Sequence, residues 1–313
     1  MNTMNDTRFG LALPQGGLLA SPTAIIDVAT AADELGYSSV WALDRLLSPV
    51  KARTPYPAAP DGQLPDEQRI VFDPIGVLTL AAAVTKRVRV GTNVLVAPWY
   101  APALLARSLT TLDHISGGRL TVGLGLGWSA DEYEAVGVPQ RRLGNHSEEI
   151  LDVLEAIWAN EIVEHDGERY HIAPSTILPK PVQGPRPPLL LAAYTPAGLD
   201  RIARRADGWT PAGLPVSAVA PMFAVVRDLA AGYGRDPDSI QLVPRANIKI
   251  TDRPLRADRP AYWGSMEQVS EDIDATRVTG ANEIILDLQA NATSAAELID
   301  LAQELLAPNL VPA

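Results

Sequence analysis

The sequence predicts an α/β fold, a single (β/α)8 TIM barrel over residues 1–313 with loop insertions at its C-terminal face. Short apolar runs rich in Val, Ile and Leu alternate with helical patterns eight times, which favours parallel strands joined by right-handed crossovers. A chain of 313 residues suits one such barrel as well as two smaller domains. The alternative, a doubly wound open sheet, normally carries G-x-G-x-x-G after its first strand, where this chain has Leu13-Pro14-Gln15-Gly16-Gly17.

The predicted strands are short apolar runs bounded by turn residues. They are expected at residues 8–13, 39–43, 88–96, 119–124, 188–192, 208–211, 240–250 and 283–288. In a barrel of parallel strands, the loops that follow these runs meet at one end, and the reacting groups of such folds lie there.

Capping residues mark the predicted helices. The first helix is expected to begin at Pro22, with Ser21 as its N-cap, and to end at Leu35, because Gly36 is a C-terminal stop signal. Comparable start signals stand at Asp73-Pro74, Ala101, Asn145 with Glu148, Thr195-Pro196, Val216, Ser265 with Gln268, and Thr293.

Two stretches interrupt the alternation of strands and helices, at about residues 45–71 and 162–187. The first is rich in proline. The second contains Asp166-Gly167, a pair typical of a tight hairpin turn. We interpret both as insertions that lie over the barrel mouth, at its C-terminal face, or on its flank.

The composition narrows the class of partner. The 26 Lys and Arg against 37 Asp and Glu give a net charge of −11, which repels nucleic acid and anionic membranes. The chain has no Cys, no apolar stretch of membrane-spanning length, and no apolar export segment at its start. We therefore expect a cytoplasmic protein that binds a small-molecule substrate, without nucleic acid or membrane as a partner. Apolar barrel helices often pair subunits, so we expect a homodimer.

Residues that follow the predicted strands are candidates for chemistry. Asp44 is a candidate for a general base or a ring-nitrogen partner, and Arg45 is a candidate for an anion-binding cation. The alternative is that the two side chains form an ordinary ion pair at the rim. Thr195 opens a helix whose free N–H groups suit an anion, or it is a plain N-cap. Trp99 and Trp128 are the tryptophans best placed to stack on a ring system.

Metal chemistry and amine chemistry have little support. The four histidines lack ligand spacing, so we expect no metal site and interpret all of them as surface or capping residues; they are His114, His146, His165 and His171. Lys249 is the only amine well placed for a Schiff-base lyase, which stays open as an alternative, as does a barrel that binds a cofactor without turnover.

A set of motifs follows in fixed order along nearly the whole chain. They read SVWALD at 39–44, VGTNVLV at 90–96, TLDHISGGR at 111–119, GLGW at 125–128 with Glu132, LPKPV at 178–182 and ADGW at 206–209. With this set the chain resembles the luciferase-like monooxygenase superfamily of flavin and deazaflavin enzymes. The stretch at 54–74 is similar to a subgroup that uses coenzyme F-420, an 8-hydroxy-5-deazaflavin, so this cofactor is favoured over FMN.

The resemblance implies a (β/α)8 barrel with the cofactor ring in its mouth. It assigns ring contacts to Asp44, Thr92, Asn93, Val94, Gly127 and Trp128. It assigns the phosphate-bearing tail to Ala193, Tyr194 and Thr195, and it places a non-prolyl cis peptide at Asn93-Val94. We interpret Trp99, Trp128 and Tyr194 as the lining of the substrate pocket.

Two departures from the family pattern bear on the reaction. Arg45 stands where similar deazaflavin enzymes commonly have His, and a guanidinium stabilises negative charge but does not exchange protons near neutral pH. Trp128 stands where sugar-phosphate dehydrogenases of the family have an acidic residue, which favours an apolar substrate. We expect hydride transfer between the deazaflavin and a small organic molecule, with Asp44 and Arg45 as the catalytic residues. FMN-dependent monooxygenation is the alternative within the family.

Overall fold

A parallel β-sheet forms the centre of the molecule. The computed structural model describes residues 7–57, 59 and 61–307. Residues 1–6, on which the expectation about an export segment partly rests, lie outside these ranges. The sheet follows the order β10-β9-β8-β5-β3-β2-β1-β14-β11. Its strands are β1 (Arg8–Ala12), β2 (Ser39–Ala42), β3 (Arg89–Thr92), β5 (Leu120–Gly125), β8 (Leu189–Leu191), β9 (Gly208–Trp209), β10 (Gln241–Leu242), β11 (Arg245–Asn247) and β14 (Glu283–Asp287), with β4 (Leu95–Val96) paired to β5.

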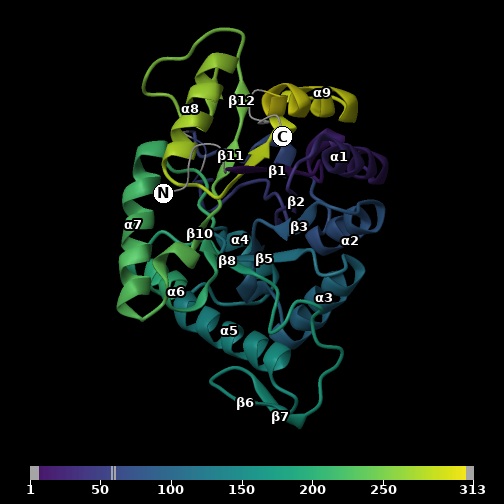
Figure 1. Ribbon diagram of the computed structural model, residues 1–313, viewed down its shortest axis with the longest axis vertical. Helices are drawn as coiled ribbons and strands as arrows, with labels where there is room; N and C mark the ends of the chain where they lie inside the picture. Colours follow the sequence, from purple (N-terminus) through teal and green to yellow (C-terminus); the bar gives the residue numbers. More distant parts are fainter. Residues whose placement is uncertain (1–6, 58, 60, 308–313) are drawn as a thin grey trace.

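The sheet is curled, and helices surround its strands on the outside (Figure 1). The fold is therefore of the α/β class. They are α1 (Pro22–Leu35), α2 (Pro74–Val84), α3 (Pro102–Ile115), α5 (Leu143–Ala159), α6 (Pro196–Arg205), α7 (Val216–Gly232), α8 (Met266–Val278) and α9 (Ala295–Leu306). The predicted caps of α1 are confirmed: Ser21 accepts a hydrogen bond from the Ala24 amide, and Gly36 is left-handed with φ of 92°. The Ser265 and Gln268 capping box of α8 is confirmed as well.

The prediction of one strand over 240–250 is wrong. The segment is divided into β10, β11 and β12 (Lys249–Ile250), and β12 leaves the main sheet to pair with β13 (Trp263–Gly264). Pro244 separates β10 from β11 because proline has no N–H to donate to a neighbouring strand. Because of this division, β10 pairs with β9 and β11 pairs with β14. The first and last strands in the order of the sheet, β10 and β11, therefore both come from the short segment 241–247.

Two helix predictions also need correction. The helix expected to be capped by Asn145 and Glu148 is α5, which begins earlier, at Leu143, after Arg142 in a left-handed conformation with φ of 51°. A short helix, α4 (Ala130–Ala135), lies in a stretch expected to be loop. Its N-cap, Ser129, accepts a hydrogen bond from the Glu132 amide, so the serine-to-glutamate spacing is the signal that would have found it.

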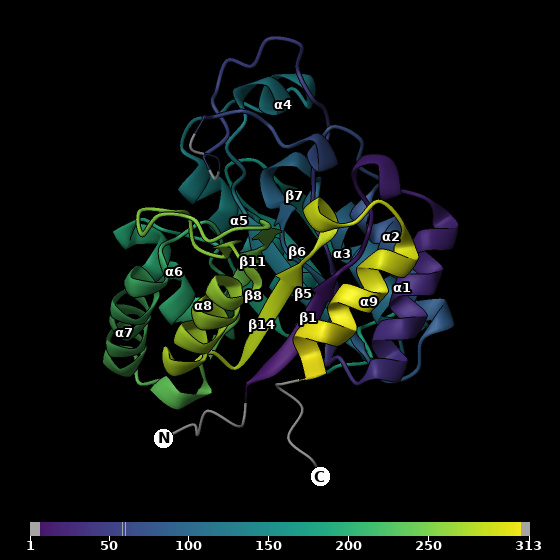
Figure 2. The same cartoon turned by 90° about the horizontal axis from the view of Figure 1, so that it is seen from above.

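The segment 45–71 lies at the carboxyl ends of the strands. Figure 2 shows this loop and α4 at the end of the molecule opposite the start of β1. The side chain of Gln15 holds the base of the loop, because its Nε2 donates to the carbonyls of Leu43 (2.8 Å) and Phe72 (3.0 Å). Its Oε1 accepts from the Leu43 amide at 2.6 Å.

The segment 162–187 lies on the flank of the molecule, beside α5, and not over the carboxyl ends of the strands. The strands β6 (Val163–Asp166) and β7 (His171–Ser175) form the expected hairpin, but Asp166 pairs with His171, so the turn is longer than two residues. The hairpin lies on the outer side of α5 (Figure 1). The Tyr170 amide donates to Glu149 Oε1, and Lys180 Nζ donates to the Asn160 carbonyl.

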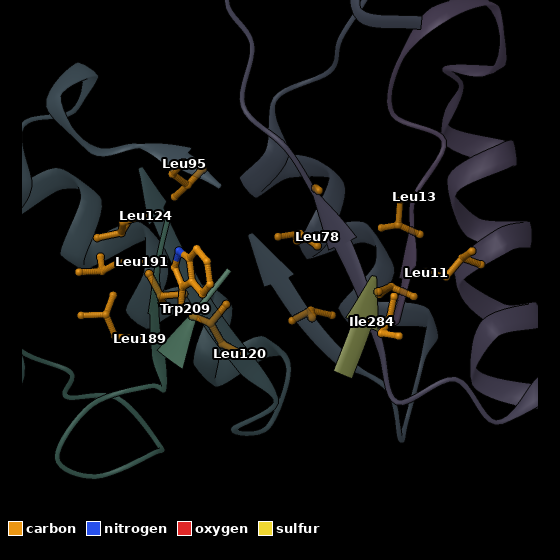
Figure 3. Packing of buried hydrophobic residues seen from close by; sticks show 14 of the residues in the cluster. Leu11, Leu13, Leu78, Leu95, Leu120, Leu124, Leu189, Leu191, Trp209 and Ile284 are labelled. Carbon is orange, nitrogen blue, oxygen red and sulfur yellow. The ribbon is translucent and has the colours of Figure 1, made fainter. Parts of the chain in front are cut away.

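Apolar side chains fill both sides of the sheet. The larger cluster packs the strands against the helices, and Figure 3 shows Leu189, Leu191 and Trp209 of this cluster near Leu120 and Leu124. A separate small cluster consists of Trp41, Leu190, Val243 and Ile285. Because side chains alternate along a strand, this second cluster lies on the inner, concave side of the sheet.

Candidate active site

The sheet places a bulge at the carboxyl end of β3. The peptide bond between Asn93 and Val94 is cis, as predicted. Asn93 is buried: its Nδ2 donates to Thr210 Oγ1 (2.6 Å) and its Oδ1 accepts from Arg245 Nη1 (3.3 Å). Beside the bulge, a Cβ on Gly125 would lie 2.6 Å from Val94 Cγ2, so only glycine fits there.

Asp44 follows β2 and faces the turn after β4. Its Oδ2 accepts hydrogen bonds from the Val96 amide (3.0 Å) and the Tyr100 hydroxyl (2.8 Å). Burial raises the pKa of Asp44 to about 6, against the lowering effect of these two donors. The carboxyl group therefore changes its protonation state close to neutral pH.

Arg45 does not form the ion pair with Asp44 that the sequence left open. Its guanidinium pairs with Glu132 of α4 at 3.2 Å, and both side chains are almost fully buried. The guanidinium also lies over the Trp128 ring, 4.9 Å from the ring centroid, and Tyr56 packs against that ring at 5.4 Å. Arg45 thus links the long loop 45–71 to α4 and to Trp128.

Glu132 binds both the Arg45 side chain and the backbone of the loop that follows it. Its Oε1 accepts from the amides of Leu46 (2.8 Å) and Leu47 (3.4 Å), while its Oε2 faces Arg45. Burial raises the pKa of Glu132, whereas these amides and Arg45 lower it. Among the residues that the structure describes, Arg45 Nε and Trp99 Nε1 are buried donors without a hydrogen-bond partner.

Three predicted residues follow β8 at the start of α6. Tyr194 is 45% exposed, and its hydroxyl exchanges hydrogen bonds with the backbone of Ala212. Thr195 is the N-cap of α6, since its Oγ1 accepts from the Gly198 amide at 3.2 Å. The Ala193 carbonyl accepts from Trp209 Nε1. The three residues present a helix start at the same end of the sheet as Asp44.

Some predicted residues lie apart from this group. Thr92 is fully buried, and its hydroxyl exchanges hydrogen bonds with the backbone of Gly123, so that hydroxyl joins β3 to β5. Lys249 lies on β12, outside the main sheet, with its Nζ 4.8 Å from the Trp263 ring centroid. His146 is buried rather than on the surface, with Nε2 2.8 Å from the Tyr170 hydroxyl.

A buried ion pair at this end of the sheet was not predicted. Arg245, 5% exposed, pairs with Asp287 (Nη2 to Oδ2, 2.5 Å) and donates from Nε to Asn247 Oδ1 (3.0 Å). Arg245 lies in the middle of the strand predicted over residues 240–250. A charged residue directly after Pro244 within an apolar run is the signal that marks the break.

Two kinds of feature are absent from residues 7–57, 59 and 61–307. None of the helices there is long and apolar enough to cross a membrane. No group of three or more His, Asp or Glu side chains in these ranges is arranged to hold a metal ion.

One protein family matches nearly the whole chain. The family model described as luciferase-like monooxygenase matches residues 4–308. An uncharacterized protein of Mycobacterium tuberculosis is 36% identical over 229 residues, 73% of this chain and 80% of that protein. The FMNH(2)-dependent dimethylsulfone monooxygenase of Pseudomonas putida is 31% identical over 155 residues, 49% of this chain and 42% of that enzyme. The coenzyme F-420-dependent tetrahydromethanopterin reductase of Methanopyrus kandleri has a similar structure, with a TM-score of 0.75 and 17% identity over 98% of this chain and all of that chain.

Proposed function

The chain belongs to the luciferase-like monooxygenase family, and from this premise we propose that it uses coenzyme F-420 to transfer a hydride to or from a small, largely apolar organic substrate. The observation that carries the proposal is the bulge at Asn93 and Val94 with Gly125 beside it, next to a carboxyl group with a pKa of about 6. We also propose that the sheet and its helices form one (β/α)8 barrel domain. The pairing of β10 with β9 and of β11 with β14 supports a closed sheet.

The residues present suit a planar ring with a phosphate-bearing tail. Gly125 and Gly127 let the side chains of Val94 and Val96 pack directly against the backbone, because a Cβ on either glycine would lie within 3 Å of a valine methyl group. The unpartnered donors Arg45 Nε and Trp99 Nε1 suit a ligand that offers acceptor oxygens. For the tail, the start of α6 at Thr195 offers backbone N–H groups. A bound deazaflavin supplies hydride transfer.

In this proposal the chain's own residues exchange a proton with the substrate and hold the substrate in position. In this proposal Asp44 gives or takes a proton at Oδ1, because its Oδ2 is held by Val96 and Tyr100. Arg45 offers its unpartnered Nε to negative charge that develops on the substrate, and it keeps Trp128 in place, while Glu132 fixes Arg45. Trp99, Trp128 and Tyr194 exclude water from an apolar substrate.

FMN-dependent monooxygenation is the second candidate. It is favoured by the FMNH(2)-dependent relative, whose similarity covers 49% of this chain. Coenzyme F-420 is preferred because the loop 54–74 resembles that of the deazaflavin subgroup. A Schiff-base lyase has little support, because Lys249 lies against Trp263 outside the main sheet.

Equilibrium titration distinguishes the candidates. We expect oxidised coenzyme F-420 to quench the tryptophan fluorescence of the purified protein saturably, and FMN to bind much more weakly. Gly125→Val places a side chain against Val94 and should weaken F-420 binding at least about tenfold, since Val94 at the bulge must shift to make room. Gly232→Ala, at the end of α7 with open space around it, is the control. Binding of FMN alone would support monooxygenation, and binding of neither cofactor would reject both candidates.

A further inference from the structure

A cavity opens beside the candidate active site. Its volume is about 140 Å³, and it lies between the loop after β9, the end of β11 and the segment before β13. Arg245 lines this cavity and also donates to Asn93 Oδ1 at 3.3 Å. The cavity is therefore one side chain away from the bulge at Asn93 and Val94.

The charged groups of the cavity are already paired. Arg245 is held by Asp287 at 2.5 Å, and Arg259, which also lines the cavity, is held by Asp272 at 2.5 Å. A ligand carboxylate would meet guanidinium groups whose charge is compensated, with the Asp287 carboxylate nearby. This arrangement favours a neutral ligand over an anion.

The polar end of the cavity donates hydrogen bonds. A guanidinium has five N–H donors and no acceptor, and Arg245 uses three of its five for Asn247, Asn93 and Asp287. Asn247 Oδ1 already accepts from Arg245 Nε, and the Asn247 amide Nδ2 adds two further donors. These donors match a carbonyl oxygen.

The other walls are apolar. Leu214 and Pro215 come from the loop before α7, and Pro260 and Ala261 come from the segment before β13. We propose that this cavity is a substrate subsite that binds a neutral carbonyl group, an amide or ketone, attached to a small alkyl group. The inference rests on the proposed function, because it assigns the subsite to the substrate of the neighbouring centre.

Isobutyramide and isobutyrate are matched probes, with the same alkyl group and a neutral or anionic end. Ligand-observed NMR titrations of the full chain at pH 7.5 should show isobutyramide binding about tenfold or more tightly than isobutyrate, the ratio that one unfavourable charge contact produces. Asp287→Asn leaves Arg245 uncompensated and should reverse the preference. Leu214→Trp fills the cavity and should abolish binding of both probes, whereas Asp252→Asn, a change at an exposed residue, should change neither.

The comparison of isobutyramide with isobutyrate on the wild-type protein tests the inference even if a variant fails to fold. Equal or tighter binding of isobutyrate to the wild type would overturn it, as would full isobutyramide binding by a folded Leu214→Trp variant. Coenzyme F-420 is titrated into the same samples. If the amide preference is present and no cofactor binds, the proposed function fails while the cavity assignment stands. If F-420 binds and the amide preference is absent, the cavity assignment fails alone.

Discussion

The Asp44 carboxyl group is surrounded by neutral hydrogen-bond donors, while the guanidinium of the next residue is bound to Glu132. Two consecutive residues therefore have separate electrostatic surroundings. The hydrogen bonds from Val96 and Tyr100 only partly compensate the burial of Asp44, which keeps its pKa at about 6. Burial and the nearby Asp44 charge also raise the pKa of Tyr100, so its hydroxyl stays a donor.

Asp44 makes the stability of the protein depend on pH in a defined window. Its pKa is about 3.8 when unfolded and about 6 when folded, so the folded state binds the proton more tightly. The contribution of Asp44 is most favourable below pH 4 and is lost as the pH rises through 6. We expect the unfolding free energy of Asp44→Asn, relative to wild type, to rise by about 2–3 kcal/mol between pH 4 and pH 7.5.

Urea unfolding at several pH values measures this difference. Asp252→Asn, at an exposed position, is the control and should follow the wild type at every pH. Parallel curves for Asp44→Asn and wild type across the window would show that Asp44 does not titrate there.

At the scale of elements, local signals predicted most of the fold. Ser21, Gly36, Thr195 and the Ser265 capping box act through hydrogen bonds within a few residues, and their helices begin or end where expected. One strand was predicted over residues 240–250 because the apolar pattern there is continuous. The division of this segment depends on pairing with β9 and β14, which lie elsewhere in the chain.

In the candidate site, too, local features could be predicted from the sequence and contacts between distant elements could not. Asp44, Arg45 and Asn93 could be nominated because they directly follow predicted strands. Their partners could not, since Glu132 and Arg245 come from elements 87 and 152 residues away from Arg45 and Asn93. An ion pair between distant elements leaves no periodic trace in a single sequence.

The loop 45–71 depends on one buried side chain at its base. Gln15→Ala removes the hydrogen bonds to Leu43 and Phe72, which leaves their backbone groups without partners. We expect trypsin to cleave after Lys51 and Arg53 about tenfold faster than in wild type, because the loop opens more often. Gln63→Ala, in the same loop but exposed, should leave the rate unchanged. Equal rates for Gln15→Ala and wild type would contradict a role of the Gln15 side chain in holding the loop.

At the scale of the whole molecule, the concave side of the sheet is layered. Ser39 and Glu283 come first along their strands, Trp41 and Ile285 come next, and Asp287 follows at the carboxyl end. The middle layer is the apolar cluster that includes Leu190 and Val243. Buried polar groups thus lie on both sides of an apolar layer.

This layer depends on a glycine of β3. A Cβ on Gly91 would lie 2.3 Å from Trp41 Cζ3, so the indole occupies the space of the missing side chain. We expect Gly91→Ala to lower the unfolding free energy by about 1–3 kcal/mol because Trp41 must move. Gly232→Ala, with no atom within 4 Å of the added Cβ, is the matched control. Urea unfolding followed by tryptophan emission measures both, and an unchanged midpoint for Gly91→Ala would contradict this packing.

The apolar layer also has a consequence for how this chain can change over generations. Substitutions at the carboxyl ends of the strands alter the groups around Asp44 and Arg245, while Ser39, Glu283 and their neighbours lie beyond the Trp41 layer. The part beyond the Trp41 layer supports the fold, whereas the residues at the carboxyl ends of the strands can be exchanged with less effect on folding. A mutational library confined to the loops at the carboxyl ends should therefore yield many folded variants with new substrate preferences.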